Sequence, residues 1–253
     1  MPSPMFPDHD QWLAPHHLLQ MWHGFEVTLQ LTAIAVVLST LLGLVLAAAR
    51  SSGNAGFRLT AAAYTSLFRN TPLLVQLLFW YFGVPALFPE GWMEWFTASD
   101  HPLALTDAFT LPWPSFEFLA AMVGVVLYST AYVSEEIRAG IRGVPHGQTQ
   151  AAAALGLTHA QVLRHIVLPQ AVRIALPTLL GQYMNILKNT SLTMAIGVAE
   201  LSYTARQVEA ESFRTFQAFA VATMLYVAAI AVIESIGLWR LHTRLMPGGT
   251  GRR

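Results

Sequence analysis

The chain has 253 residues, of which 54% are hydrophobic and 11% carry a formal charge. Soluble domains usually contain about 25% charged residues, so this composition indicates an integral membrane protein. The net charge is zero and cysteine is absent, which argues against nucleic-acid binding and excludes disulfides and thiolate metal sites. No two histidines have the i, i+4 spacing of a helical metal pair, so we expect no metal site.

Five apolar segments are predicted to cross the membrane. The first, residues 25–49, has no charge between Val27 and Ala49, and these 23 residues suffice for about 30 Å of hydrocarbon. Residues 1–26 contain no Lys or Arg, so we interpret this segment as an uncleaved span and not as a signal peptide. The other four spans are predicted at residues 57–83, 116–137, 174–198 and 215–239.

Prolines, loops and the distribution of arginines indicate how these spans are arranged in the membrane. Pro72 lacks a backbone donor and is expected to bend the second span. Residues 84–114 are predicted to form a loop rich in proline and aromatic residues. With the N-terminus outside, ten arginines lie in the inner segments and two in the outer ones, as the positive-inside rule requires. The sequence therefore predicts one all-α membrane domain over residues 1–253, with five transmembrane helices and its C-terminus in the cytoplasm.

A polar, Ala-rich segment, residues 143–169, separates the third and fourth spans. Pro145 is suited to the start of a helix, and Gly156 is suited to end it in a left-handed conformation. The sequence from Thr158 to Gln161 has the pattern of a capping box that opens a second helix, and Pro169 is expected to stop that helix. The segment is therefore predicted to be a cytoplasmic loop of two short helices.

The apolar residues of this loop suggest what it does. Leu155, Val162 and Leu163 are expected to be exposed, which suits a helix laid into the groove of a partner protein. The alternative is an amphipathic helix that lies on lipid, but such helices carry Lys or Arg beside a large apolar face. The first helix has neither residue, so docking to a protein is the favoured interpretation.

Ala151-Ala152, Gly156, Ile166 and Leu168-Pro169 resemble the EAA loop of type I ABC importer permeases. Gln150 stands where that loop usually has Glu, so a neutral amide replaces a carboxylate at this position. The resemblance implies seven residues that couple the chain to an ATPase: Gly147, Gln150, Ala151, Ala152, Gly156, Leu168 and Pro169.

Two further motifs resemble those of polar amino-acid permeases, the histidine, glutamine and glutamate group. They are residues 68–76 (FRNTPLLVQ) and residues 187–192 (LKNTSL). The outer loop that begins at residues 80–85 (WYFGVP) is similar to that of glutamate/aspartate permeases. The resemblance implies a multi-pass subunit of the bacterial inner membrane. It also implies a second permease chain, identical or related, two cytoplasmic ATPase subunits and an extracytoplasmic solute-binding protein. The chain has no phosphate-binding Walker motif, so we expect ATP at the partner, no cofactor here and no catalytic residue.

Polar residues within the spans are candidates for the substrate path. Arg69 and Lys188 are the bases deepest within spans, where charges are costly. Either is a candidate to bind a substrate carboxylate. Arg69 is alternatively a structural residue at the bend, and Lys188 a partner of Glu234. The remaining candidates are polar residues that line a path or hold helices together: Gln76, Gln182, Asn185 and Asn189.

Two other classes of protein remain as alternatives. An ion-coupled carrier that acts alone would need intramembrane carboxylates, and only Glu234 qualifies. A membrane-embedded enzyme would need a nucleophile, a metal site or paired carboxylates, and no such constellation is present in the sequence.

Overall fold

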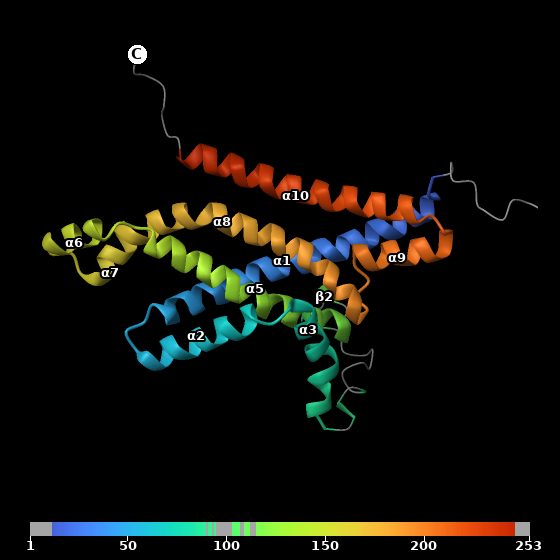
Figure 1. Cartoon of the computed structure of the whole chain (residues 1–253), viewed down its shortest axis with the longest axis horizontal. Helices are drawn as coiled ribbons and strands as arrows, with labels where there is room; N and C mark the ends of the chain where they lie inside the picture. Colours follow the sequence, from blue (N-terminus) through green and yellow to red (C-terminus); the bar gives the residue numbers. More distant parts are fainter. Residues whose placement is uncertain are drawn as a thin grey trace, which may run out of the picture. The chain divides into compact units, whose positions relative to one another are not determined.

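The computed structural model describes residues 12–89, 91–92, 94, 103–106, 109–111 and 115–245. Figure 1 shows that helices dominate this part of the chain. Within it, three helices are long and apolar enough to cross a membrane: α1 (Pro15–Arg50), α5 (Phe116–Arg142) and the first part of α10, Thr215–Gly237. The full α10 runs from Thr215 to Leu245. These helices match the first, third and fifth predicted spans.

The second predicted span is not one bent helix. It consists of α2 (Ala55–Arg69) and α3 (Leu73–Leu78), which continues as a π-turn, Phe79–Gly83, and a 3-10 turn, Pro85–Leu87. Pro72 has an extended backbone with ψ 139° and caps α3. Because a proline disfavours helical geometry in the residue before it and supplies no N–H, the chain breaks here and does not merely bend.

The fourth predicted span begins earlier and ends differently. The helix α8 spans Leu168–Asn189 and passes into a 3-10 helix, Thr190–Ile196. It is followed by α9 (Leu201–Ser212), a helix that the sequence reading did not anticipate. Glu200 caps α9, because its carboxylate accepts a hydrogen bond from the Tyr203 N–H at 2.9 Å.

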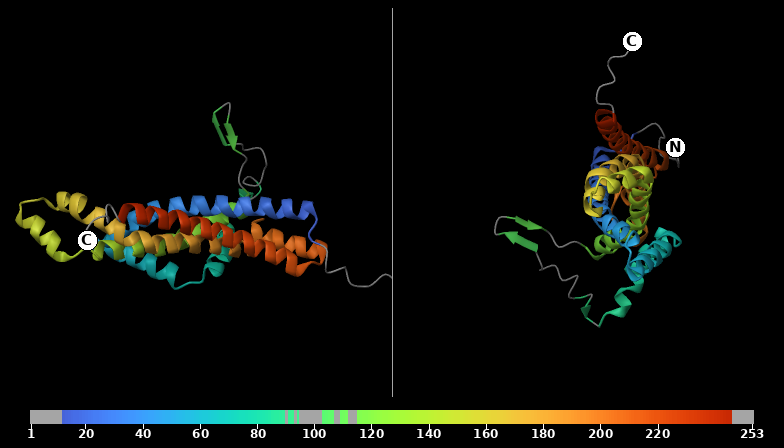
Figure 2. Two further views of the ribbon diagram at one scale, coloured as in Figure 1. Left: turned by 90° about the horizontal axis from the view of Figure 1, so that it is seen from above. Right: turned by 90° about the vertical axis from the view of Figure 1, so that its left-hand side faces the viewer.

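The predicted loop at residues 84–114 contains a strand pair, so the all-α prediction needs this correction. Strands β1 (Leu103–Thr106) and β2 (Phe109–Leu111) are antiparallel, with Leu103 opposite Leu111 (Figure 2). The strands have the sequences Leu-Ala-Leu-Thr and Phe-Thr-Leu, in which threonine and phenylalanine favour extended structure.

The chain forms two compact units, each assembled from three separate stretches. The first comprises Met1–Ala35, Thr71–Leu127 and Asn189–Leu225. Its fully buried side chains include Met21, Leu31, Leu77, Val125 and Leu201. Glu200 is also fully buried, where it accepts a hydrogen bond from the Thr28 hydroxyl at 3.3 Å, so this carboxylate joins α1 to the start of α9.

The second unit comprises Val36–Asn70, Tyr128–Lys188 and Tyr226–Arg253. The end of α5 packs against the start of α8 within it. A Cβ on Gly140 would lie 2.6 Å from the Ala171 carbonyl oxygen, so only glycine permits this approach. This unit also contains both candidate sites described below.

Candidate functional site

The first candidate site is the α6–α7 element, residues 143–169, which joins α5 to α8 (Figure 1). Its helix α6 spans His146–Ala154 with Pro145 as N-cap, and Gly156 has a left-handed φ of +83°. Both helix signals in the sequence are thereby confirmed, since glycine adopts this φ without the penalty of a Cβ.

The predicted capping box is also present at the start of α7 (His159–Val162). The Thr158 N–H donates to Gln161 Oε1 at 2.8 Å, and the Gln161 N–H donates to Thr158 Oγ1 at 3.4 Å. These reciprocal bonds satisfy donors that a helix start otherwise leaves unpaired.

The prediction that Pro169 stops the second helix is wrong. The helix continues from α7 through a π-turn, Leu163–Val167, directly into α8. In this turn the Leu168 N–H donates to the Leu163 carbonyl, one residue further back than in an α-helix. The wider turn explains how a proline that lacks a donor and crowds the preceding turn is accommodated.

The α6–α7 element has a hydrophobic core of its own. The buried residues of this core are Val144, Ala152, Val162, Val167 and Ala171. The predicted exposure of Val162 is therefore wrong, since only 7% of it is exposed. The capping box turns this face of α7 toward α6, so Val162 packs inward. Gln148 and Gln170 add a side-chain hydrogen bond across the element.

The end of α6 and the turn after it expose apolar, uncharged residues, and we call residues 153–156 the tip of the element. Leu155 is 81% exposed and Leu163 is 38% exposed, as predicted for both. Of the seven residues predicted to couple to an ATPase, only Ala152 is buried. The other six are exposed: Gly147, Gln150, Ala151, Gly156, Leu168 and Pro169. The element therefore combines a fixed interior with an open surface.

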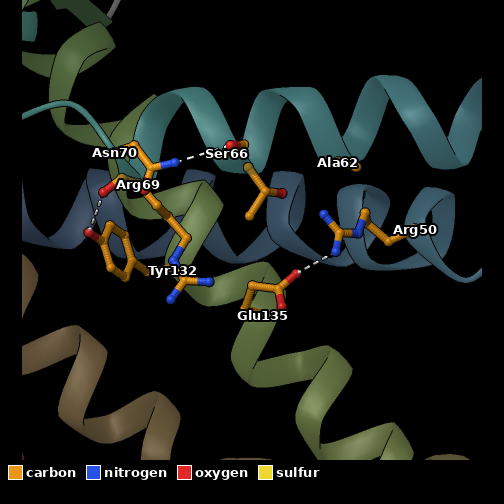
Figure 3. A pocket seen from close by; sticks show the side chains of 8 residues that line it. Arg50, Ala62, Ser66, Arg69, Asn70, Tyr132 and Glu135 are labelled. Carbon is orange, nitrogen blue, oxygen red and sulfur yellow. Dashed lines mark hydrogen bonds and ion pairs between the residues drawn. The ribbon is translucent and has the colours of Figure 1, made fainter.

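The second candidate site is a pocket of about 410 Å³ in the same unit, which we call the Arg69 pocket. Its volume is in the range of small-molecule sites, about 300–1,000 Å³. Residues of α1, α2 and α5 line it (Figure 3): Arg50, Ala62, Thr65, Ser66, Arg69, Asn70, Tyr132 and Glu135.

Charged groups converge on the Arg69 pocket from three helices. The Arg69 guanidinium lies over the Tyr132 ring, 5.2 Å from its centroid. Glu135 forms an ion pair with Arg138 at 2.7 Å and a longer one with Arg50 at 3.7 Å. Figure 3 shows the Arg50 and Arg69 guanidiniums on either side of the Glu135 carboxylate. Three guanidiniums accompany one carboxylate, so the cluster has a net positive charge suited to an anionic group.

The other predicted path residues lie elsewhere. Gln76 is buried on α3, in the first unit, where its amide donates to the Thr71 hydroxyl at 2.6 Å. It does not line the Arg69 pocket. Arg69 and Gln76, both expected on the second predicted span, therefore do not share a helix face, because the break at Pro72 places them on separate helices.

The polar residues Gln182, Asn185 and Asn189 form a stripe along α8, with Lys188 beside it. Asn185 and Lys188 are exposed, and Gln182 and Asn189 are half-buried. Ala171 and Ala175 are buried on the same side of the helix as Gln182 and Asn189, since spacings of four and seven residues return to one face. Polar side chains on a membrane helix are expected to meet water or protein rather than lipid. Glu234 is also exposed, and its pairing with Lys188 stays a prediction.

Sequence reasoning did not assign to a substrate path four polar or charged members of the Arg69 pocket: Arg50, Asn70, Tyr132 and Glu135. Arg50 ends α1, 19 positions before Arg69, and Tyr132 lies on a third helix. No local pattern joins them. The one signal available was the run Arg69-Asn70 itself, two polar residues inside an apolar segment.

Comparison with known proteins gives a consistent result. Residues 31–239 match the family model described as "Binding-protein-dependent transport system inner membrane component". The chain is 33% identical to the probable amino-acid ABC transporter permease protein PatM of Vibrio harveyi, over 84% of this chain and 86% of that protein. It is 32% identical to the glutamate/aspartate import permease protein GltJ of Escherichia coli (strain K12), over 91% and 89% of the two chains.

Solved structures agree with these sequence matches. A crystal structure of an amino acid ABC transporter with histidines superposes with a TM-score of 0.75 at 29% identity, covering 90% of this chain and 95% of that one. An inward-facing structure of the MetNI methionine ABC transporter has a TM-score of 0.71 at 16% identity, covering 91% and 99%, and shows a shared fold.

Proposed function

The chain belongs to the family of binding-protein-dependent transport system inner membrane components, and from this premise we propose how it works as the translocation subunit of an ABC amino-acid importer. Its relatives carry names that include glutamate/aspartate, arginine and glutamine transport. We propose a polar amino acid as the cargo, with glutamate and aspartate as the first candidates. An ion-coupled carrier that acts alone is not favoured, since the relatives are ABC permeases.

The proposed arrangement has five membrane crossings in a bacterial inner membrane. The N-terminus lies outside and the C-terminus and the α6–α7 element lie in the cytoplasm. A dimer of ATP-binding subunits contacts the α6–α7 element, a second permease chain completes the path, and a solute-binding protein delivers the amino acid from outside. ATP is bound and hydrolysed by the partner, so this chain needs no cofactor and supplies no catalytic group.

One observation carries this proposal: the α6–α7 element is internally packed but presents an open apolar tip. Leu155 is 81% exposed, while five residues of the element and its flanks form a buried core. A rigid body with an exposed anchor transmits motion from a partner to α5 and α8, to which it is directly joined. Closure of the ATPase dimer would thereby switch the access of the path.

The Arg69 pocket and the stripe on α8 are the proposed substrate path in the second unit. The Arg69 guanidinium offers a charge-assisted contact to the carboxylate that every amino acid carries. Gln182, Asn185 and Lys188 supply further polar contacts along α8. Gln76 and Asn189, in the first unit, are retained as proposed path residues on the basis of the sequence.

Uptake by the reconstituted complex tests this function. The chain, its ATPase, its binding protein and any second permease chain are placed in liposomes, and tritiated L-glutamate, L-aspartate, L-glutamine, L-histidine and L-arginine are supplied in turn. We expect uptake of at least one of them only with ATP inside and the binding protein outside. Uptake that persists without the ATPase and collapses with the ion gradient would refute the proposal.

A further inference from the structure

The carboxylate of Glu135 both lines the Arg69 pocket and forms an ion pair with a residue outside it. It lines the Arg69 pocket, and it is held by Arg138, which does not line that pocket. The Arg138 Nε donates to Oε1 at 3.1 Å and its Nη2 donates to Oε2 at 2.7 Å, so the pair is bidentate. Glu135 is the only carboxylate among the eight lining residues of this pocket.

The ion pair lies in a poorly solvated setting. Only 17% of the Glu135 side chain and 19% of the Arg138 side chain are exposed. A carboxylate in such a place requires a cation at all times, because an unpaired charge there is strongly unfavourable. Exchange of one cation for another keeps the Glu135 carboxylate compensated, and the long side chain of the released Arg138 can extend its guanidinium to water.

The turn of α5 that follows Arg138 packs closely against the α6–α7 element and the start of α8. It lies one turn before the end of α5, which leads directly into that element. Gly140, two residues later, touches the backbone of α8 at Ala171, and Ile141 packs against the buried core of the element. A displacement of this last turn of α5 therefore reaches the element through rigid contacts.

We propose that Glu135 binds the cargo and links occupancy of the Arg69 pocket to the α6–α7 element by exchanging its partner. In the empty pocket the carboxylate holds Arg138. When an amino acid enters, its carboxylate binds Arg69 and its α-ammonium takes Glu135. Arg138 is then released, and the last turn of α5 shifts the element toward the state that the ATPase recognises. This inference rests on the proposed function.

The chemistry explains why both charges are present in one pocket. Arg69 and Arg50 alone would serve for an anion. A carboxylate beside them adds a site for a cation, and an α-amino acid carries both groups on one carbon. The pocket therefore suits a zwitterion, and Glu135 is the group by which the amino end of the cargo is sensed.

The test uses the complete complex in liposomes and measures ATP hydrolysis and uptake of the five tritiated amino acids in parallel. Glu135→Gln is expected to abolish the stimulation of ATP hydrolysis by cargo. Uptake per ATP hydrolysed is expected to fall about tenfold or more, the size of a lost charge-assisted contact. Glu136→Gln is the matched control, because Glu136 is adjacent on α5 but does not line the pocket.

A variant in which Glu135 and Arg138 are exchanged distinguishes a loss of stimulation by cargo from a loss of protein stability. Glu135→Arg combined with Arg138→Glu restores an ion pair within α5 but moves the carboxylate out of the pocket. We expect complex assembly and thermal stability to recover while stimulation by cargo stays lost. Recovery of stimulation in the swap, or equal coupling in Glu135→Gln and Glu136→Gln, would overturn this inference alone. Absence of all uptake by the unchanged complex would overturn the proposed function and this inference with it.

Discussion

The α6–α7 element and the Arg69 pocket lie in one unit of the chain but arise in opposite ways. The element is built from consecutive residues, and its helix ends are set by Pro145, Gly156 and the Thr158–Gln161 box. The pocket is assembled from three helices, with Arg50, Arg69 and Glu135 brought together only by packing. The comparison teaches that the part expected to meet a motor protein is locally encoded, whereas the part expected to meet cargo depends on tertiary structure.

The largest effect is expected at the exposed tip of the element. Leu155→Asp places a charge on an apolar docking surface, so ATP-dependent uptake should fall about 30-fold or more, the size of an interface hot spot. The fold of the chain should be unchanged, because Leu155 is 81% exposed. Uptake and co-purification of the ATPase are measured together, with Leu155→Met as a conservative control. Full uptake by Leu155→Asp would show that this surface meets no partner.

A smaller effect is expected in the pocket. Arg69→Gln removes the guanidinium proposed to bind the cargo carboxylate, and uptake should fall about tenfold, as for a lost charge-assisted contact. Association with the ATPase should stay intact, which separates the two regions. Arg58→Gln is the control, since Arg58 is an exposed base on α2 that does not line the pocket. If both variants behaved alike, Arg69 would be a structural residue at the end of α2.

The core of the element should respond to truncation with a modest loss of stability. Val162→Ala leaves a small cavity among Val144, Ala152 and Val167, which is expected to cost about 1–2 kcal/mol. Amide hydrogen exchange should accelerate across α6 and α7. Leu163→Ala, at an exposed position, should accelerate amide hydrogen exchange much less. Equal acceleration in the two variants would argue against a separately packed element.

The smallest effect concerns the capping box. Gln161→Ala removes the acceptor for the Thr158 N–H and should cost about 0.5–1 kcal/mol. Gln161→Glu retains an acceptor at this position and should be close to neutral. Hydrogen exchange at the first turn of α7 measures both variants. Faster exchange in Gln161→Glu than in Gln161→Ala would contradict the role assigned to this side chain.

Features that depend on residues within one turn were predicted correctly from the sequence, whereas features that depend on more distant residues were not. The left-handed Gly156 and the capping box were predicted because each depends on residues within one turn. Pro169 was misjudged because a π-turn upstream removes the clash on which the prediction depended. Val162 was misjudged because its burial depends on α6, ten residues earlier, and not on its own pattern.

The break at Pro72 and the Arg69 pocket depend on contacts between distant parts of the chain, which the sequence pattern does not reveal. Proline was recognised, but whether it bends or ends a helix depends on what surrounds it, and here it separates Arg69 from Gln76. Arg50 was counted only as a basic residue near the end of a span. Its approach to Glu135 joins positions 85 residues apart, which no periodicity reveals.

The most direct measurement of the central claim is a site-specific crosslink from α6 to the ATPase. The chain has no cysteine, so His146→Cys introduces a single thiol at an exposed position of this helix. In inverted membrane vesicles that carry the active complex, we predict a disulfide or maleimide crosslink to a cysteine on the ATP-binding subunit, with a yield that changes when ATP is added. A thiol that is labelled by a membrane-impermeant reagent applied to the periplasmic face of spheroplasts, and never crosslinks to the ATPase, would contradict the account.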